Sequence, residues 1–188
     1  PPLQLRDADG NPAGYTVELA QQMFADLNPD VTLEFVEVPF GELFGALAAG
    51  RFDMSAIGAT ILPSRAQQVM FASEPLFIEN NVILRNVDSP VGEVADLNDS
   101  GVRIAVLAGS AQEASARQLF PEAELVSLEQ QPAVQEAATG RADVVLLGEF
   151  NIAAALSENT GLEVLPGPPV FADINTWLMP PGDHKMQA

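Results

Sequence analysis

The segment 58–65 (GATILPSR) brings together residue types that suit the binding of a carboxylate. Gly58 lets the backbone approach a ligand closely, and Thr60 offers a hydroxyl group. Arg65 presents a planar guanidinium that can hold a carboxylate through two parallel hydrogen bonds. The chain has eight Lys and Arg residues in total. An arginine at such a loop therefore favours carboxylate binding, with a surface ion pair as the alternative.

Few residues of the chain could support covalent or metal chemistry. Cysteine is absent and the single histidine is His184. Disulfides, thiolate zinc sites and cysteine nucleophiles are therefore excluded, and a Ser-His-Asp triad or a multi-histidine metal site would have to recruit His184. We expect no catalytic residues, no metal site and no cofactor.

The charge balance limits the partners. With 8 Lys and Arg against 26 Asp and Glu, the net charge is −18 and the pI is about 4.1. Such a chain repels phosphate backbones and anionic headgroups, so we expect no nucleic-acid partner. Apolar runs such as 144–147 are too short for a membrane span. The chain starts with Pro-Pro, which predicts a mature or trimmed product.

Apolar runs with a period of two alternate with helical stretches, which is typical of an α/β fold. We expect helices over 16–27 (capped by Thr16), 43–49, 111–120, 132–139 and 150–158. We expect strands over 3–5, 32–38, 53–57, 81–85, 102–107, 124–128, 144–147, 163–165 and 174–179.

An internal repeat predicts two lobes. Residues 48–57 (AAGRFDMSAI) resemble residues 138–147 (ATGRADVVLL), and the copies lie 90 residues apart. Each copy is an alanine-rich helix end, a Gly-Arg-x-Asp corner and an apolar run, so two lobes of one topology would explain the spacing. The alternative is coincidence at a common helix-to-strand corner. Ligands of such sheets bind at the carboxyl ends of strands, which directs attention to the loops after residues 57, 107 and 147.

Several motifs occur in the order typical of one protein family. Segment 58–65 resembles the G-x-T-I-T-x-x-R motif of extracytoplasmic solute-binding proteins for polar amino acids, which have the type 2 periplasmic binding fold. Residues 1–20, 105–113 (AVLAGSAQE) and 140–143 (GRAD) resemble further motifs of this family. The resemblance covers essentially the whole chain.

The resemblance implies a two-lobed α/β fold that closes over a small solute like a clamshell. Lobe 1 would comprise residues 1–86 and 172–188, lobe 2 would comprise 87–171, and the ligand cleft would lie between them. The hinges would lie near 85–88 and 172–175. Compared with the family, the chain lacks the first strand and most of the final helices. We expect a monomer.

The resemblance also implies ligand-binding residues. Arg65 matches the arginine that holds the α-carboxylate of the solute, and Thr60 and the backbone of Gly58 match its hydrogen-bonding neighbours. Ser110 and Ala111 match a second-lobe loop whose N–H groups, at the start of a helix, also reach that carboxylate.

Three further positions have alternative interpretations. Phe40 lies where the family often stacks an aromatic ring on the solute, although ordinary core packing would also explain it. At Gly148 the family usually has an aspartate that pairs with the α-ammonium of the ligand, which glycine cannot do. Glu149 either substitutes for this aspartate or is a solvated carboxylate at a helix start, and a third option is a ligand without an ammonium group.

The resemblance implies a non-enzymatic receptor, periplasmic or otherwise extracytoplasmic, soluble or lipid-anchored. It would deliver a small carboxylate-bearing ligand, most simply a polar amino acid, to the permease of an ABC importer. One alternative is a cyclohexadienyl (arogenate or prephenate) dehydratase, for which Glu149 is the candidate acid and Asn151 lies near the expected position. Another is the ligand-sensing domain of a membrane signalling protein. The side chain of the ligand is not defined by the sequence.

Overall fold

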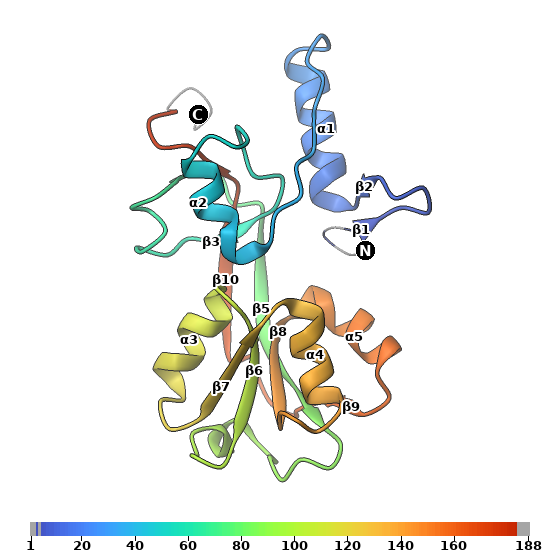
Figure 1. Cartoon of the computed structure of the whole chain (residues 1–188), viewed down its shortest axis with the longest axis vertical. Helices are drawn as coiled ribbons and strands as arrows, with labels where there is room; N and C mark the ends of the chain where they lie inside the picture. The colour runs from blue at the N-terminus through green and yellow to red at the C-terminus, as the bar shows by residue number, and fades with distance from the viewer. Residues whose placement is uncertain (1–2, 4, 184–188) are drawn as a thin grey trace. The chain divides into compact units, whose positions relative to one another are not determined.

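The computed structural model describes residue 3 and residues 5–183, and their contacts group the chain into two units. The first unit combines the described parts of Pro1–Ile78 and Ile174–Ala188, and the second is Glu79–Asp173. The chain enters the second unit within strand β5 (Phe77–Asn86) and leaves it within β10 (Phe171–Thr176), as Figure 1 shows. The predicted α/β class with two crossover strands is confirmed.

The second unit is a sheet covered by helices. Its strands follow the order β10-β5-β8-β6-β7, and β9 pairs with β5 off this path; β6 is parallel to β7 and β8, and β5 is antiparallel to β8 and β9. The elements that follow β5 are η2 (Val94–Leu97), β6 (Arg103–Leu107), α3 (Ala111–Leu119), β7 (Glu124–Leu128), α4 (Gln130–Ala138), β8 (Val144–Gly148), η3 (Glu149–Asn151), α5 (Ile152–Glu158) and β9 (Leu162–Val164), where η marks a short 3-10 helix.

Strand β8 is buried along its whole length, which explains its uninterrupted apolar sequence. Because successive side chains of a strand point to opposite faces, Val144 and Leu146 pack in one apolar cluster and Val145 and Leu147 in another. The first cluster includes Ala116 of α3, and the second includes residues of α4 and α5. Helices therefore cover both faces of the sheet.

The sheet brings several loop positions to one edge. Strands β6, β7 and β8 are parallel, so their carboxyl ends lie at the same edge. Strand β5 runs the other way and pairs Asn81 with Gly148, so the beginning of β5 lies at this edge too. The residues that start β5 are thereby placed beside those that follow β8.

The first unit has shorter elements. They are β1 (Leu5–Arg6), β2 (Pro12–Ala13), α1 (Tyr15–Leu27), η1 (Phe40–Glu42), α2 (Leu43–Ala48), β3 (Ala59–Thr60), β4 (Met70–Phe71) and β11 (Leu178–Met179). Strand β1 pairs with β2, β3 with the end of β10, and β4 with β11, all antiparallel. A core cluster joins α2 to β3 and β11 and consists of Leu43, Phe44, Leu47, Ala59, Val69 and Leu178.

Two predicted strands of this unit are wrong. Residues 32–38 alternate in sequence but form no regular element, and none of the described strands pairs with them. A strand needs a partner for its backbone groups, and alternation alone does not supply one. Residues 53–57 also form no strand. Ser55 there donates its N–H to the carbonyl of Leu178 (3.0 Å) and accepts the N–H of Leu178 at its hydroxyl (3.1 Å). These two hydrogen bonds connect the segment to β11 without forming a regular ladder of backbone hydrogen bonds.

The start of helix α1 also differs from the prediction. The N-cap position is Gly14, whose φ of 107° is left-handed backbone that favours glycine. Thr16 lies inside the helix instead of capping it, and its hydroxyl donates to the carbonyl of Leu3 at 3.1 Å. A polar side chain near a helix start can therefore anchor the preceding chain.

The internal repeat is reproduced only as far as the helix end. Gly50 and Gly140 both have φ of 71°, as expected for the residue after a helix. In each copy the following arginine donates its N–H to the carbonyl five residues back, at 3.0 Å for Arg51 and 2.9 Å for Arg141. Only the second copy continues into a strand, β8.

Candidate functional site

The predicted carboxylate-binding arginine lies against two aromatic rings in the first unit. Arg65 is 5% exposed, and its guanidinium carbon lies 4.5 Å from the centre of the Phe44 ring and 5.7 Å from that of Phe40. Its Nη1 donates to the carbonyl of Thr60 at 2.9 Å. Cation–π contacts and this hydrogen bond fix the position of the charge.

The neighbours of Arg65 differ in how they support it. Phe40 packs edge to face on Phe44, with 5.9 Å between the ring centres, so in this structure it belongs to the packing around Arg65. The hydroxyl of Thr60 donates to Oδ1 of Asn175 at 3.4 Å. Gly58 is tightly enclosed, because an added Cβ would lie 3.0 Å from the Phe77 ring and 3.2 Å from Cβ of Asn175. A larger residue at 58 would require the Phe77 ring and Asn175 to shift by a few tenths of an ångström.

Asn175 is a polar residue of this group that the sequence did not suggest. It is 5% exposed, and its Nδ2 has no hydrogen-bond partner among the described residues. The amide lies in β10 opposite Thr60 of β3. Its signal in the sequence is weak, because asparagine inside an apolar strand segment has no fixed role.

The loop before α3 is held by its own hydrogen bonds. Ser110 is the N-cap residue: its hydroxyl accepts the N–H of Glu113 at 3.1 Å and donates to the carbonyl of Leu107 at 2.6 Å. The Glu113 carboxylate accepts the N–H of Gly109 at 2.7 Å. Because a helix start leaves its first N–H groups without helical partners, Ala111 at the first position of α3 retains a donor.

Glu113 stays charged in this arrangement. Burial disfavours its charged form, but hydrogen bonds from Arg117, the N–H of Gly109 and the hydroxyl of Ser127 together lower the pKa of Glu113 below its ordinary value. Arg117 lies four residues further along α3 and contacts the Glu113 carboxylate at 2.6 Å. The loop is thereby fixed before any ligand binds.

Glu149, the predicted partner of a ligand cation, is hydrogen-bonded within the second unit. Its Oε1 accepts the backbone N–H of Asn80 at 3.1 Å, and both carboxylate oxygens accept from Nδ2 of Asn80 at 3.2 Å. Glu149 therefore ties η3 to β5. Its role towards a ligand stays a prediction.

The space beside Gly148 is filled by a residue that the sequence did not suggest. A Cβ at position 148 would collide with the carboxylate of Glu79. Gly148 has φ of −67°, so its backbone would accept any residue, and contact with Glu79 is what restricts this position. An aspartate at this position would therefore have to displace Glu79.

Glu79 is a buried carboxylate in an acidic setting. It is 8% exposed, its Oε1 has no hydrogen-bond partner in the described part of the chain, and the carboxylate accepts the N–H of Phe150. Burial, together with repulsion from Asp173 and Glu149, raises the pKa of Glu79 to about 7. A cation placed here would relieve both effects.

A buried polar chain surrounds this carboxylate. Asn81 is fully buried and donates its Nδ2 to Oδ2 of Asp173 at 2.9 Å. Its Oδ1 accepts from Nε2 of Gln112 at 2.6 Å. Alternation along β5 could have indicated in the sequence that these residues are buried, because Glu79 and Asn81 lie on the same face of the strand as Ile83, a core residue.

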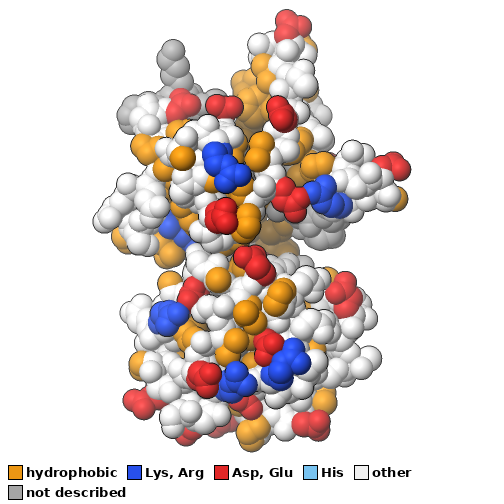
Figure 2. All heavy atoms as spheres, in the orientation of Figure 1, with side chains coloured by type: hydrophobic (Ala, Val, Ile, Leu, Met, Phe, Trp, Pro, Cys, Tyr) orange, Lys and Arg blue, Asp and Glu red, His pale blue; other side chains and the backbone are white. Residues whose placement is uncertain are grey.

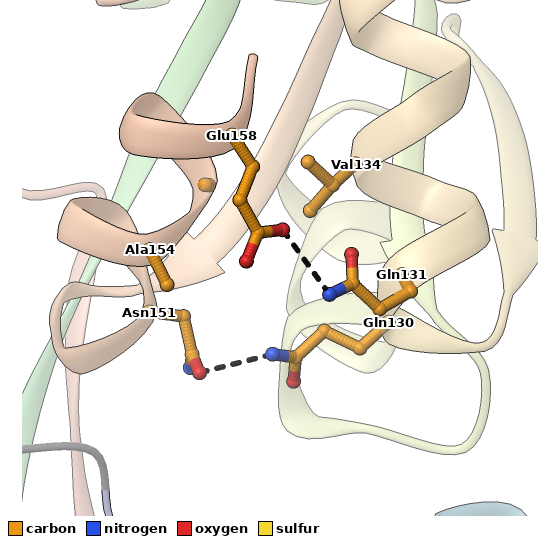
Figure 3. A pocket seen from close by; sticks show the side chains of 7 residues that line it. Gln130, Gln131, Val134, Asn151, Ala154 and Glu158 are labelled. Atoms are coloured by element: carbon orange, nitrogen blue, oxygen red, sulfur yellow. Dashed lines mark hydrogen bonds between the residues drawn. The ribbon is translucent and has the colours of Figure 1, made fainter.

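A small pocket in the second unit lies apart from these residues. It is a hollow of about 40 Å³ between α4 and α5. Figure 3 shows Gln130 donating to Asn151 at 2.9 Å and Gln131 donating to Glu158 at 3.5 Å across it. The hollow is too small for an amino acid. Asn151, named above for a dehydratase site, is committed to this contact.

Two properties of the described residues bear on metal and membrane binding. Within residues 3 and 5–183, no set of three or more His, Cys, Asp or Glu side chains is arranged to hold a metal ion. None of the described helices is both long and apolar enough to cross a membrane.

On the face shown in Figure 2, acidic side chains are dispersed among neutral and apolar ones.

Two α/β units joined by two crossover strands define a periplasmic-binding type 2 fold. The sequence agrees: residues 1–153 match the bacterial extracellular solute-binding proteins, family 3, and the chain belongs to this family. The family resemblance inferred from the motifs is confirmed.

Curated relatives include proteins of two kinds. The chain is 29% identical over 148 residues to a probable amino-acid ABC transporter periplasmic-binding protein of Sinorhizobium fredii, covering 76% of this chain and 48% of that protein. It is 31% identical over 117 residues to membrane-bound lytic murein transglycosylase F of Maricaulis maris, covering 62% of this chain and 25% of that protein. The chain thus spans about half or less of the length of these relatives.

Solved structures share the fold. A putative ABC-transporter binding component from Wolinella succinogenes, complexed with lysine, is 27% identical with a TM-score of 0.85, covering 99% of this chain and 80% of that one. An ancestral amino acid-binding protein described as a precursor of cyclohexadienyl dehydratase is 26% identical with a TM-score of 0.84, covering 99% and 80%.

Proposed function

We propose that this chain is the ligand-binding part of an extracytoplasmic receptor for a polar amino acid, which it delivers to an ABC importer without chemical change. Family membership supports this role, as do the periplasmic-binding relative from S. fredii and the lysine complex from W. succinogenes. The proposed location is the periplasm or another extracytoplasmic compartment, the proposed partner is an ABC permease, and the proposed oligomeric state is a monomer.

The observation that carries the proposal is the setting of Arg65. Arg65 is 5% exposed, so the residue has been largely removed from water, and two aromatic rings and a carbonyl already hold its guanidinium in place. A ligand carboxylate would therefore meet a preorganised partner and would not have to order a flexible side chain. Thr60 and Gly58 are the proposed neighbours of that carboxylate, with Phe40 behind Arg65.

The second unit supplies a further set of proposed contacts. Ser110 and Ala111 begin α3, where the N–H groups and the helix dipole favour an anion. The same sheet edge carries Glu149 and the other carboxylates described above. An amino acid has an anionic carboxylate, which suits the N–H donors at the start of α3. It also has a cationic ammonium group, which suits the carboxylates at this sheet edge.

The experiment is calorimetric titration of the chain with amino acids and organic acids. Arg65→Ala should weaken binding by about 2–5 kcal/mol, because the ligand carboxylate would be left buried and unpaired. Arg65→Lys should restore part of the loss, since ammonium cannot form the two-toothed contact. Arg51→Ala is the matched control, because Arg51 is exposed and its contact with the Glu42 carboxylate is long, at 3.9 Å. Equal affinity for Arg65→Ala and wild type would refute the role of Arg65.

A dehydratase remains the second candidate because of one observation. The pKa of Glu79 is raised to about 7 by burial and by its acidic neighbours, so a protonated acid is available at neutral pH. Incubation with prephenate, followed by the absorbance of phenylpyruvate, tests this activity. The receptor proposal expects no turnover, and turnover lost in Glu79→Gln would establish the enzyme instead.

A further inference from the structure

We propose that Glu79 is the anion that receives the ammonium group of the solute in the second unit, and that Gly148 is glycine because the Glu79 carboxylate occupies the space of its side chain. The inference rests on the proposed function and adds the residue that recognises the cationic end of the ligand.

The first argument is the missing partner of a buried carboxylate. Glu79 is more than nine-tenths buried, and its Oε1 has no hydrogen-bond partner within the described residues. A buried carboxylate oxygen without a donor is costly, and the cost is removed by a proton or by a cationic donor. An ammonium group supplies both the charge and up to three N–H donors.

The second argument is the arrangement of charges around Glu79. The titratable groups that face it are Glu149 from η3 and Asp173 from β10, both acidic. Glu149 is held by Asn80, and Asp173 by Asn81, so each has donors of its own. Glu79 accepts one backbone N–H, from Phe150. Glu79, whose Oε1 accepts no hydrogen bond within the described residues, therefore has unused acceptor capacity.

The third argument is the steric relation with Gly148. Any side chain at 148 would collide with the Glu79 carboxylate, while the backbone there has an ordinary φ of −67°. Either position can therefore present a carboxylate in this space, but not both at once. The acid comes from β5, and the partner strand β8 supplies the room.

The test begins with wild type and calorimetric titrations of L-lysine, L-arginine, L-histidine, L-glutamine and L-glutamate, followed by the other standard amino acids. Failure of wild type to bind any of them would overturn the receptor function, and the inference with it. The tightest binder is then compared with its analogues that lack the α-amino group or the side-chain amino group. Loss of affinity in one analogue identifies which ammonium group is recognised.

Glu79→Gln should then weaken binding of the amino acid by roughly tenfold or more, the scale of a lost charge-assisted hydrogen bond. It should leave the analogue without the recognised ammonium nearly unaffected. Glu158→Gln, at an exposed position of the same unit, is the matched control and should change affinity by less than about threefold. Wild-type binding with unchanged affinity in Glu79→Gln would overturn the assignment while leaving the receptor function intact. A loss confined to Glu149→Gln would assign the role to Glu149.

Gly148→Ala keeps every carboxylate and pushes that of Glu79 away from its place, so it should also weaken the amino acid and spare the analogue. Glu79→Ala combined with Gly148→Asp moves the acid from β5 to β8 and should recover part of the affinity lost in Glu79→Ala. If Glu79→Gln does not fold, the Gly148→Ala titration decides: unchanged affinity overturns the proposal.

Discussion

Removal of the Glu79 charge should make the stability of the protein much less dependent on pH. In the folded chain burial and the neighbouring Asp173 and Glu149 raise the pKa of Glu79 from an ordinary 4.5 to about 7. Between these two values the unfolded chain has released the proton and the folded chain still holds it. The folded state therefore loses relative stability as the pH rises from about 4.5 to about 7.

The magnitude follows from the two pKa values. Each pH unit in this interval costs about 1.4 kcal/mol, so the full effect is about 3 kcal/mol above pH 7 relative to pH 4. Glu79→Gln removes the titrating group and keeps the shape of the side chain. The variant should gain about 3 kcal/mol on wild type between pH 4 and pH 8, with most of the change between about pH 4.5 and 7.

The assay is urea unfolding of both proteins at a series of pH values without ligand, followed by circular dichroism and analysed by linear extrapolation. Glu158→Gln, an exposed position in the same unit, is the control and should follow the wild-type pH curve. A stability difference between Glu79→Gln and wild type that does not vary between pH 4 and pH 8 would show that Glu79 titrates normally, and would refute the reasoning.

Three further outcomes are expected. Ser110→Ala should lower stability by about 1 kcal/mol in urea unfolding, because the Glu113 N–H loses its cap; a neutral result would mean that the cap is unimportant. Gly140→Ala should cost about 1 kcal/mol in the same assay, because alanine disfavours φ of 71°, and an increase in stability would contradict this. Affinity for the amino acid ligand should rise between pH 6 and pH 8 as Glu79 ionises, and calorimetry of Glu79→Gln should show a flatter profile.

Periodicity predicted the second unit well, because its strands are buried on both faces or paired along their length. The run 144–147 became β8, and the helices expected over 111–120 and 132–139 became α3 and α4 with ends shifted by one or two residues. The same rules failed for 32–38 and 53–57. Alternation describes which side chains could be buried, whereas a strand also requires a ladder of backbone hydrogen bonds. Residues 32–38 pair with none of the described strands, and residues 53–57 make only the link between Ser55 and Leu178.

For the candidate site, the sequence determined the residue types and the loops that carry them. The segment 58–65 contains an arginine and a hydroxyl group near a glycine, and the two Gly-Arg-x-Asp corners predict two helix ends. Local chemistry fixes such features, because a left-handed glycine or a helix cap depends on a few adjacent residues. Family membership followed from the order of these motifs.

Only the tertiary structure decided what surrounds the charges. Burial of Arg65 against Phe40 and Phe44 depends on the packing of α2 and β3, which the motif does not encode. Glu79 and Gly148 are 69 residues apart, and they meet because β5 and β8 pair in the register that sets Asn81 opposite Gly148. A shift of one residue in that register would turn Glu79 to the other face of the sheet, since successive side chains alternate. The sequence names the acid and the glycine, and the pairing of two distant strands makes them one site.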